Sequence, residues 1–405
     1  MQGYWARELA HTIAEALNDL PVAVVTGMRQ VGKSTMLEND SLFSDRAYLG
    51  LDDFGTLAEL RENPYGVLDR NARVSIDEAQ RYPEIFMALK RVVDKERQPG
   101  RFLLSGSANF ALLRGVSESL AGRAIYFDLL PMSRREISGE IQNEPFIVSF
   151  FRKPILAKDS DYEPVADREV LQGGLPPVAV GGVRNRASWF KGYEQTYLER
   201  DLRDVASVEN VFGFRNLLKL TALRTAQILN ASELARDASL PTNTATRYLG
   251  WMEASFMIRR LPPFMRNKSS SVIKTPKVFL TDSGLACYLC GCRDLRDDPL
   301  RGAFLETYVF QNLLSILEAH FQHADLFYWR TRGGSEVDFV IDEARQCVAI
   351  EVKSGARWDR RDLKGLRSFL EATPRCKAAI LAYNGTEVAQ LGDRLWVIPL
   401  GLLLS

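Results

Sequence analysis

The first third of the chain alternates short apolar runs with stretches of helical periodicity. The runs have the length and β-branched or leucine content of buried strands, and they cover residues 22–25, 47–51, 73–77, 101–105 and 124–129. Before the first run, Leu9, Ile13 and Leu17 recur at steps of four and predict an amphipathic helix. Strands that alternate with helices favour an α/β fold built on a parallel sheet.

The segment after the first run has the pattern of a phosphate-binding loop, G-x-x-x-x-G-K-S. Its residues are Gly27, Met28, Arg29, Gln30, Val31, Gly32, Lys33, Ser34 and Thr35. The glycines let backbone N–H groups point toward an anion at the start of a helix. Lys33 would reach the β- and γ-phosphates of ATP, and Ser34 would ligate Mg²⁺. We predict nucleotide binding; the alternative is an ordinary glycine-containing turn.

Polar residues around the later strands predict the rest of a hydrolytic site. Asp77 would hold Mg²⁺ and its water shell, and Glu78 would orient and deprotonate the attacking water. Ser107 and Asn109 follow the fourth run, at the strand ends where open α/β sheets bind ligands, and are candidates for sensing hydrolysis. Arg123 is either an arginine finger, in cis or in trans, or an ordinary surface residue.

The middle of the chain predicts a nucleic-acid-binding module. A poorly periodic linker and helical lid is expected first, and a helix at 217–229 follows it. A helix, a short turn and a second helix then match a helix-turn-helix. The polar face of the second helix carries Thr242, Asn243, Thr246 and Arg247.

A basic run follows the second helix and lies between two expected strands, as the wing of a winged helix would. Its candidates for DNA contacts are Arg259, Arg260, Arg266, Lys268 and Lys274. Because the run contains no acidic residue, we predict that it meets nucleic acid. The alternative is that it docks within the molecule, against the ATPase domain.

Charged residues inside apolar strands mark the last part of the chain. Asp338 lies within one expected strand, and Glu351 and Lys353 share one face of the next. Such burial is costly unless the charges pair with each other or with a cation. Asp338 and Glu351 would hold Mg²⁺, Glu306 could add a ligand from a helix, and Lys353 would orient water in a metal-dependent nuclease. The alternative is a salt-bridged set without catalysis. Residues 395–404 predict a final strand.

Composition adds limits to this picture. A chain of 405 residues is expected to form two to four domains. A net charge of +1 means that any phosphate-binding surface must be a local patch. Five cysteines imply no disulfide framework and suit a reducing cytoplasm. We expect a cytoplasmic protein without a membrane partner, because the longest apolar stretch is too short to span a bilayer.

The motifs at residues 27–35, 76–80, 104–108, 120–123 and 129–131 resemble prokaryotic AAA-type ATPases that carry a C-terminal domain of unknown function. The resemblance implies a P-loop ATPase domain (1–137), a linker and lid (138–213), a winged helix (214–285) and a restriction-endonuclease-like α/β domain (286–405). It also implies ATP-site roles for Lys33, Ser34, Asp77 and Glu78. In the last domain Asp338, Glu351 and Lys353 fit a PD-(D/E)XK signature, although Val337 stands where proline is usual.

The predicted function is an ATPase that binds, remodels or translocates duplex or branched DNA, with Mg²⁺-dependent cleavage by the last domain as a further activity. The alternative is a nucleotide-dependent regulatory or defence switch with a non-catalytic nuclease-like platform. A role for Arg123 in trans would require a homo-oligomer.

Overall fold

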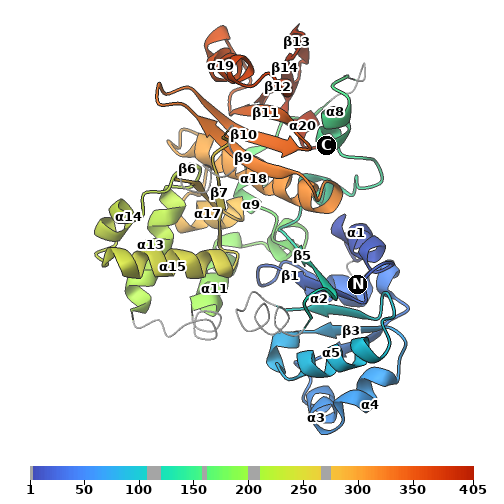
Figure 1. Ribbon diagram of the computed structural model, residues 1–405. Coiled ribbons are helices and arrows are strands. Elements are labelled where there is room, and N and C mark those ends of the chain that lie inside the picture. The colour runs from blue at the N-terminus through green and yellow to red at the C-terminus, as the bar shows by residue number, and fades with distance from the viewer. Residues whose placement is uncertain (1–2, 107–119, 157–161, 199–209, 266–274) are drawn as a thin grey trace.

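The apolar runs of the first third form one parallel sheet in the order β2-β3-β4-β1-β5, as the α/β interpretation requires. The computed structural model describes residues 3–106, 120–156, 162–198, 210–265 and 275–405 (Figure 1). The elements of this N-terminal part are α1 (Leu9–Ala16), β1 (Val22–Thr26), α2 (Lys33–Asn39), η1 (Ser41–Phe43), β2 (Ala47–Gly50), α3 (Phe54–Glu62), α4 (Pro64–Asp69), β3 (Val74–Asp77), η2 (Ala79–Arg81), α5 (Ile85–Lys95), β4 (Phe102–Ser105) and β5 (Ala124–Asp128).

The strand register brings the polar strand ends to one edge of this sheet. Val25 on β1 lies beside Ser105 on β4, and Gly50 on β2 lies beside Asp77 on β3. Apolar side chains of α1 and α2 pack on one face of the sheet, and those of α3 to α5 pack on the other. The segment that follows β1 is therefore held at the edge where Asp77 also lies.

The next segments form short helices and then a small helical part with its own sheet. The short helices are α7 (Arg134–Ser138), α8 (Phe146–Arg152), α9 (Asp167–Gln172), α10 (Pro176–Ala179) and α11 (Arg186–Thr196). The middle part consists of α13 (Val211–Leu223), β6 (Gln227–Ile228), α14 (Ala231–Asp237), α15 (Thr242–Ala254), β7 (Ile258–Leu261), β8 (Lys277–Leu280) and α17 (Ser283–Leu289). Its three strands are antiparallel, in the order β6-β8-β7.

The C-terminal part is a mixed six-stranded sheet in the order β13-β14-β12-β11-β10-β9. The hairpin β9–β10–β11 is antiparallel, and β11, β12 and β14 are parallel. Its elements are α18 (Arg301–His320), β9 (Asp325–Arg330), β10 (Glu336–Glu343), β11 (Gln346–Lys353), η4 (Arg360–Leu363), α19 (Lys364–Ala372), β12 (Cys376–Tyr383), β13 (Ala389–Gly392), β14 (Leu395–Pro399) and α20 (Leu400–Leu403).

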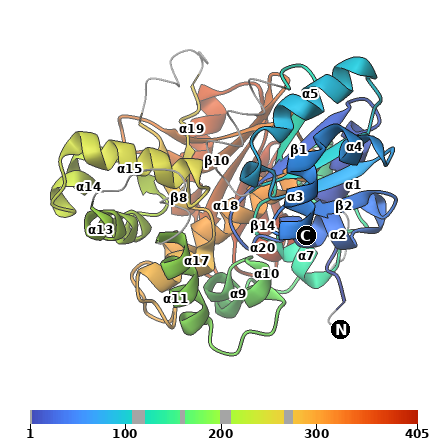
Figure 2. The same cartoon turned by 90° about the horizontal axis from the view of Figure 1, so that it is seen from below.

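One apolar core joins all of these parts. It runs from α1 and one face of the N-terminal sheet, through α18, to the middle part and the inner face of the C-terminal sheet. In Figure 1, α18 lies below the C-terminal sheet, and Figure 2 shows the N-terminal part and α13–α15 on opposite sides of it. Phe310 on α18 is central to this core, because its ring stacks on Phe279 of β8 with centroids 4.1 Å apart and also faces Phe339 of β10.

Two predicted elements are wrong in their bounds. The helix expected at 217–229 ends at Leu223, because Ala226 takes a left-handed φ of 65° and the next residues pair with β8 as β6. The strand expected at 395–404 ends at Pro399, and α20 follows it. Among the described residues, no helix has the length and apolar character needed to cross a membrane.

We expect Phe310→Ala to lower the free energy of unfolding by about 3–5 kcal/mol, because it leaves a cavity where three parts of the molecule meet. Urea denaturation followed by circular dichroism measures the change. Phe212→Ala, whose ring is 79% exposed on α13, is the matched control and should stay within about 0.5 kcal/mol of wild type. Coincident urea transitions for the two variants would contradict the central position of Phe310.

Candidate active site and nucleic-acid interface

The loop after β1 has the backbone that its glycines predict. Gly27 has φ +148°, and a Cβ there would lie 2.3 Å from the carbonyl oxygen of Leu129. Gly32 has φ +101° and is the residue before α2. The Lys33 side chain is buried, and its Nζ donates to the carbonyl oxygens of Gly27 at 2.9 Å and Met28 at 2.8 Å. The Lys33 ammonium therefore lies inside the loop. Only glycine can occupy position 27, because any side chain there would collide with Leu129.

Asp77 lies at the same sheet edge, held by two hydroxyl groups. Tyr48 donates from its OH to Asp77 Oδ2 at 2.8 Å, and Ser105 Oγ donates to Oδ1. Burial and then the Asp77 carboxylate raise the pKa of Tyr48, so its hydroxyl stays protonated as a donor. Glu78 follows with a left-handed φ of 55° and accepts a hydrogen bond from Gln80. The two predicted acids are adjacent, but only Asp77 is buried.

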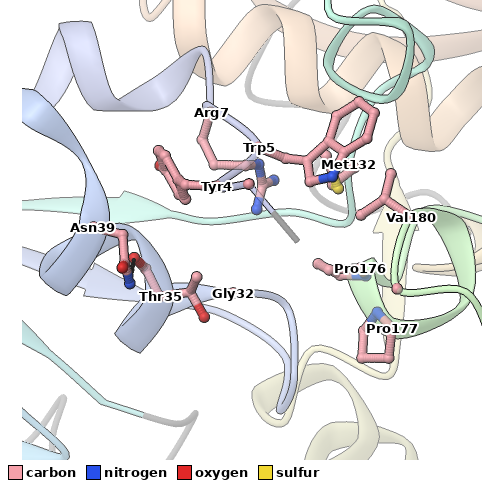
Figure 3. Close-up of a pocket in the computed structure, with 12 residues that line it drawn as sticks. Tyr4, Trp5, Arg7, Gly32, Thr35, Asn39, Met132, Pro176, Pro177 and Val180 are labelled. Atoms are coloured by element: carbon pink, nitrogen blue, oxygen red, sulfur yellow. Dashed lines mark hydrogen bonds between the residues drawn. The ribbon is translucent and has the colours of Figure 1, made fainter. Parts of the chain in front are cut away.

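A pocket of about 300 Å³ opens beside the loop. Figure 3 shows three walls: Tyr4 and Trp5 from the N-terminal segment, Thr35 and Asn39 from α2, and residues around α10. The α10 wall consists of Pro176, Pro177, Val180 and Gly181. Aromatic and apolar walls beside a phosphate-binding loop are suited to a nucleotide base and ribose.

Arg7 ties the N-terminal segment to the phosphate loop. Its guanidinium donates to the carbonyl oxygen of Val31 at 2.8 Å and to that of Leu130 at 2.6 Å. Its Nε lies 3.1 Å from Glu136, and both side chains are at most 4% exposed. A buried guanidinium that donates to two backbone carbonyls fixes the positions of Val31 and Leu130 relative to the N-terminal segment. The position of the phosphate loop therefore depends on Arg7, which lies 20 residues before Gly27 in the sequence.

Arg123 does not reach the phosphate loop of its own chain. Ala124, the next residue, pairs with Val22 at the start of β1, whereas the loop follows the opposite end of that strand. Arg123 instead pairs with Asp94 at 2.6 Å. An arginine finger in cis is therefore wrong, and the role in trans stays a prediction. Five other predicted site residues lie outside the described residues: Ser107, Asn109, Arg266, Lys268 and Lys274.

The polar face of α15 is open to solvent. The described side chains that are exposed on it are Thr242, Asn243, Thr246 and Arg247. Arg247 lies over the Trp251 ring at 5.2 Å from its centroid, which orients the guanidinium along the helix surface. This face combines hydroxyl, amide and guanidinium groups, the types that contact phosphates and base edges.

The two described arginines of the basic run have acidic partners within the molecule. Arg259 donates to Asp128 Oδ2 at 2.8 Å, and Arg260 lies 3.1 Å from Glu253. Asp128 ends β5, so Arg259 docks the middle part against the N-terminal sheet. For Arg259 this geometry agrees with the alternative of intramolecular docking.

The charged residues predicted in the C-terminal part surround a lysine that the sequence argument did not assign to this site. Lys277 Nζ lies 3.0 Å from Glu306, 2.7 Å from Glu336 and 3.2 Å from Asp338. Glu351 pairs instead with Lys353, at 3.0 Å. Glu306 and Asp338 thus meet at Lys277 together with Glu336, whereas Glu351 pairs separately with Lys353.

The burial of this acidic cluster shifts its ionisation. Burial and then the Asp338 charge raise the pKa of Glu351 to about 8. The same two causes raise the pKa of Glu306 well above its usual range. Burial by itself lowers the pKa of Lys277, but Asp338, Glu306 and Glu336 outweigh it and raise that pKa well above the usual value. Burial therefore favours the protonated forms of Glu306 and Glu351, while the neighbouring acids favour the charged form of Lys277.

The predicted Mg²⁺ site of the C-terminal part does not fit this arrangement. Asp338 Oδ1 faces Lys277, and its Oδ2 accepts a hydrogen bond from the Val352 backbone N–H at 3.0 Å. Within the described ranges, no three His, Cys, Asp or Glu side chains are grouped so that they could hold a metal ion. At the phosphate loop, the half-buried Ser34 hydroxyl and the Asp77 carboxylate are the oxygen donors that a nucleotide-bound Mg²⁺ would take, and Asp77 would have to exchange a hydrogen bond from Tyr48 or Ser105 for the ion or its water shell.

Family comparisons divide the chain into three matched regions. Residues 19–138 match a model described as "AAA domain". Residues 19–138 are therefore similar to AAA-type domains. Residues 165–296 and 301–403 each match a domain of unknown function, DUF8612 and DUF4143. The match of residues 19–138 supports nucleotide-dependent activity in this part of the chain.

Relatives extend over almost the whole chain. Uncharacterized proteins of Mycobacterium tuberculosis and Mycobacterium bovis are each 28% identical over 403 residues, covering 98% of this chain and 84% of theirs. The Walker-type ATPase of Pyrococcus abyssi is 17% identical, with 71% of this chain and 96% of that chain covered and a TM-score of 0.45. The RuvB Holliday junction branch migration motor of Thermotoga maritima is 16% identical, with 62% and 87% covered and a TM-score of 0.28.

Several site residues lie far in sequence from the groups they serve. Tyr48 and Ser105 contact Asp77 from other strands, Arg7 contacts the loop from before α1, and Lys277 enters the acidic cluster from β8. A strand end beside the phosphate loop could have indicated Ser105. For Arg7 and Lys277 the only signal was a charged residue next to an apolar run.

We expect Arg7→Met to lower the free energy of unfolding by about 3–5 kcal/mol, because it leaves Glu136 buried without its cation. Thermal unfolding followed by circular dichroism measures the loss. Arg70→Ala removes a solvent-exposed pair with Glu59 and is the matched control, which should leave the transition unchanged. Equal melting temperatures for the two variants would contradict a restraining role for Arg7.

Proposed function

We propose that this protein is a Mg²⁺-dependent ATPase whose hydrolysis cycle acts on DNA bound by its middle part. The observation that carries the proposal is the loop after β1, where the Lys33 side chain is buried inside the loop and Gly32 and Thr35 line the 300 Å³ pocket. Nucleotide-dependent activity agrees with the AAA-type match of residues 19–138. Action on DNA is the further step.

The chain's own residues divide the work of hydrolysis. The loop N–H groups and the Lys33 ammonium bind the phosphates and offset charge on the transferring group. Mg²⁺ beside Ser34 and Asp77 would neutralise the β- and γ-phosphate oxygens. Glu78 accepts the proton of the attacking water and orients it in line. Tyr4, Trp5 and the α10 wall hold the base and shield the phosphates from solvent water.

A chain of contacts joins the phosphate loop to the middle part. Thr26, directly before Gly27, donates from Oγ1 to Asp128 Oδ1 at 2.7 Å. The other oxygen of Asp128 accepts from Arg259 on β7 at 2.8 Å. A shift of the loop during the ATP cycle therefore acts on a carboxylate that also holds the strand next to α15. This contact supports coupling between ATP and the proposed DNA-binding face.

The order α13, β6, α14, α15, β7, β8 supports a winged-helix interpretation of the middle part, with α15 as the helix that faces DNA. Its exposed face offers one guanidinium and three short polar side chains. DNA cleavage is not included in the proposal, because Lys277 lies among the carboxylates that would have to hold a metal ion.

A second function, a nucleotide-dependent switch with a non-cutting C-terminal platform, is favoured by the same Lys277 contacts. In that case ATP would gate protein contacts, and the α15 face would not need DNA. Binding of duplex and four-way-junction DNA by the purified chain separates the two functions, because a switch of this kind predicts no DNA affinity.

We expect Lys33→Ala to lower kcat/KM for ATP hydrolysis by roughly 100-fold or more, because it removes the cation that meets the transferring phosphate. A coupled phosphate-release assay measures this loss. Lys95→Ala, an exposed lysine at the end of α5 in the same domain, should hydrolyse ATP at the wild-type rate. Unchanged hydrolysis in Lys33→Ala would rule out the loop as the ATP site.

We expect Arg247→Ala to weaken DNA binding and to reduce the slope of log Kd against log salt by about one, because one phosphate contact is lost. Fluorescence anisotropy with labelled duplex and junction DNA at several salt concentrations measures both. Arg70→Ala is the matched control. It also removes one positive charge, but in the N-terminal part, and this variant should bind DNA as wild type does. Identical slopes for wild type and Arg247→Ala would remove α15 from the interface.

A further inference from the structure

Lys277 has the environment of a bound cation rather than that of a surface lysine. Its side chain is 3% exposed, and its Nζ lies within 3.2 Å of three carboxylates. These carboxylates come from α18 and β10, whereas Lys277 is the first residue of β8. The ammonium therefore enters the C-terminal part from a strand that belongs to the middle part.

The carboxylates have little capacity left for another cation. Asp338 uses one oxygen for Lys277 and the other for the Val352 backbone N–H. Glu351 is engaged by Lys353 at 3.0 Å. A divalent ion at this place would need oxygen ligands at about 2.0–2.6 Å and would have to displace an ammonium held on three sides. Two like-charged cations cannot share this space without strong repulsion.

The backbone around Lys277 is anchored as well. Tyr328 of β9 donates from its OH to the carbonyl oxygen of Thr275 at 2.6 Å, and its ring centroid lies 5.8 Å from Lys277 Nζ. The Tyr328 backbone N–H donates to the Pro262 carbonyl oxygen at 3.0 Å, and its carbonyl accepts from Phe264 at 2.5 Å. Both described ends of the segment between β7 and β8 are thus held against β9, which fixes the backbone position from which Lys277 reaches the cluster.

We propose that Lys277 is the resident cation of the cluster formed by Glu306, Glu336 and Asp338, so that this nuclease-like site binds no divalent metal and serves as the joint between the middle and C-terminal parts. The inference is independent of the proposed ATPase and DNA-binding functions. Lys277 takes the place that a metal ion would have in this cluster, so the C-terminal part needs no metal ion to balance its buried carboxylates.

The test is a titration of the nucleotide-free full chain with MnCl₂, with free Mn²⁺ followed by electron paramagnetic resonance. Wild type and Asp338→Asn should give the same isotherm. Lys277→Ala, which uncovers the carboxylates, should bind Mn²⁺ at least about tenfold more tightly than wild type, and Lys277→Ala/Asp338→Asn should lose the gain. Lys277→Arg is the matched control, because it keeps a cation in place and should gain no site. The ATP site is the same in all variants, so the differences isolate the cluster.

Two outcomes would overturn the proposal: Mn²⁺ binding in wild type that Asp338→Asn abolishes, or equal Mn²⁺ affinity in wild type and Lys277→Ala. If Lys277→Ala does not fold, a second measurement tests whether the cluster binds a divalent ion with Lys277 in place. It uses Asp77→Asn, which removes the carboxylate of the proposed ATP-site Mg²⁺, and compares the melting temperature of this variant in 1 mM MnCl₂ and in EDTA. We expect a difference below about 1 °C, because a ligand stabilises only a protein that binds it. A rise of several degrees in MnCl₂ would overturn the proposal.

Discussion

A charge removed from water destabilises a protein by several kcal/mol unless a partner of opposite sign meets it with good geometry. This constraint acts at each junction between the parts of the molecule. Arg7 meets Glu136 beside the phosphate loop, Arg259 meets Asp128 at the end of β5, and Lys277 meets the acidic cluster. A shift of one part against another would separate these charges, so the pairs set the relative positions that the apolar core alone would leave less defined.

The apolar core and the ion pairs contribute different things. The core around Phe310 contributes buried apolar area, and the hydrophobic stabilisation from that area is non-directional. The ammonium of Lys277 among three carboxylates depends on geometry, because its charge-assisted hydrogen bonds weaken as the distances rise above about 3 Å. The joint at Lys277 therefore adds specificity to a stability that the stack of Phe279, Phe310 and Phe339 already provides.

Sequence reasoning succeeded where the physical signal is local. The loop at Gly27 to Lys33 needs particular residue types at fixed spacing, and the period-two pattern around Asp338 and Glu351 indicates which side chains share a face of a strand. It failed where the decisive partner is distant. Nothing near Lys277 indicates that Asp338, 61 residues later, will meet it. The charge of Arg259 was visible, but its partner on another sheet was not, so a phosphate contact and an internal contact could not be separated.

Asp128 shows how these parts can work together. Its two side-chain oxygens bind Thr26 and Arg259, and its backbone N–H donates to Glu318 of α18 at 3.0 Å. A nucleotide can shift the middle part only through contacts that differ between nucleotide states. Asp128 is placed where such a difference would be transmitted, because it touches the residue before the phosphate loop, the strand that follows α15, and the helix that supports the C-terminal sheet. A change of a few tenths of an ångström at Thr26 would therefore act on two other parts at once, whereas the joint at Lys277 holds those two parts together as one body.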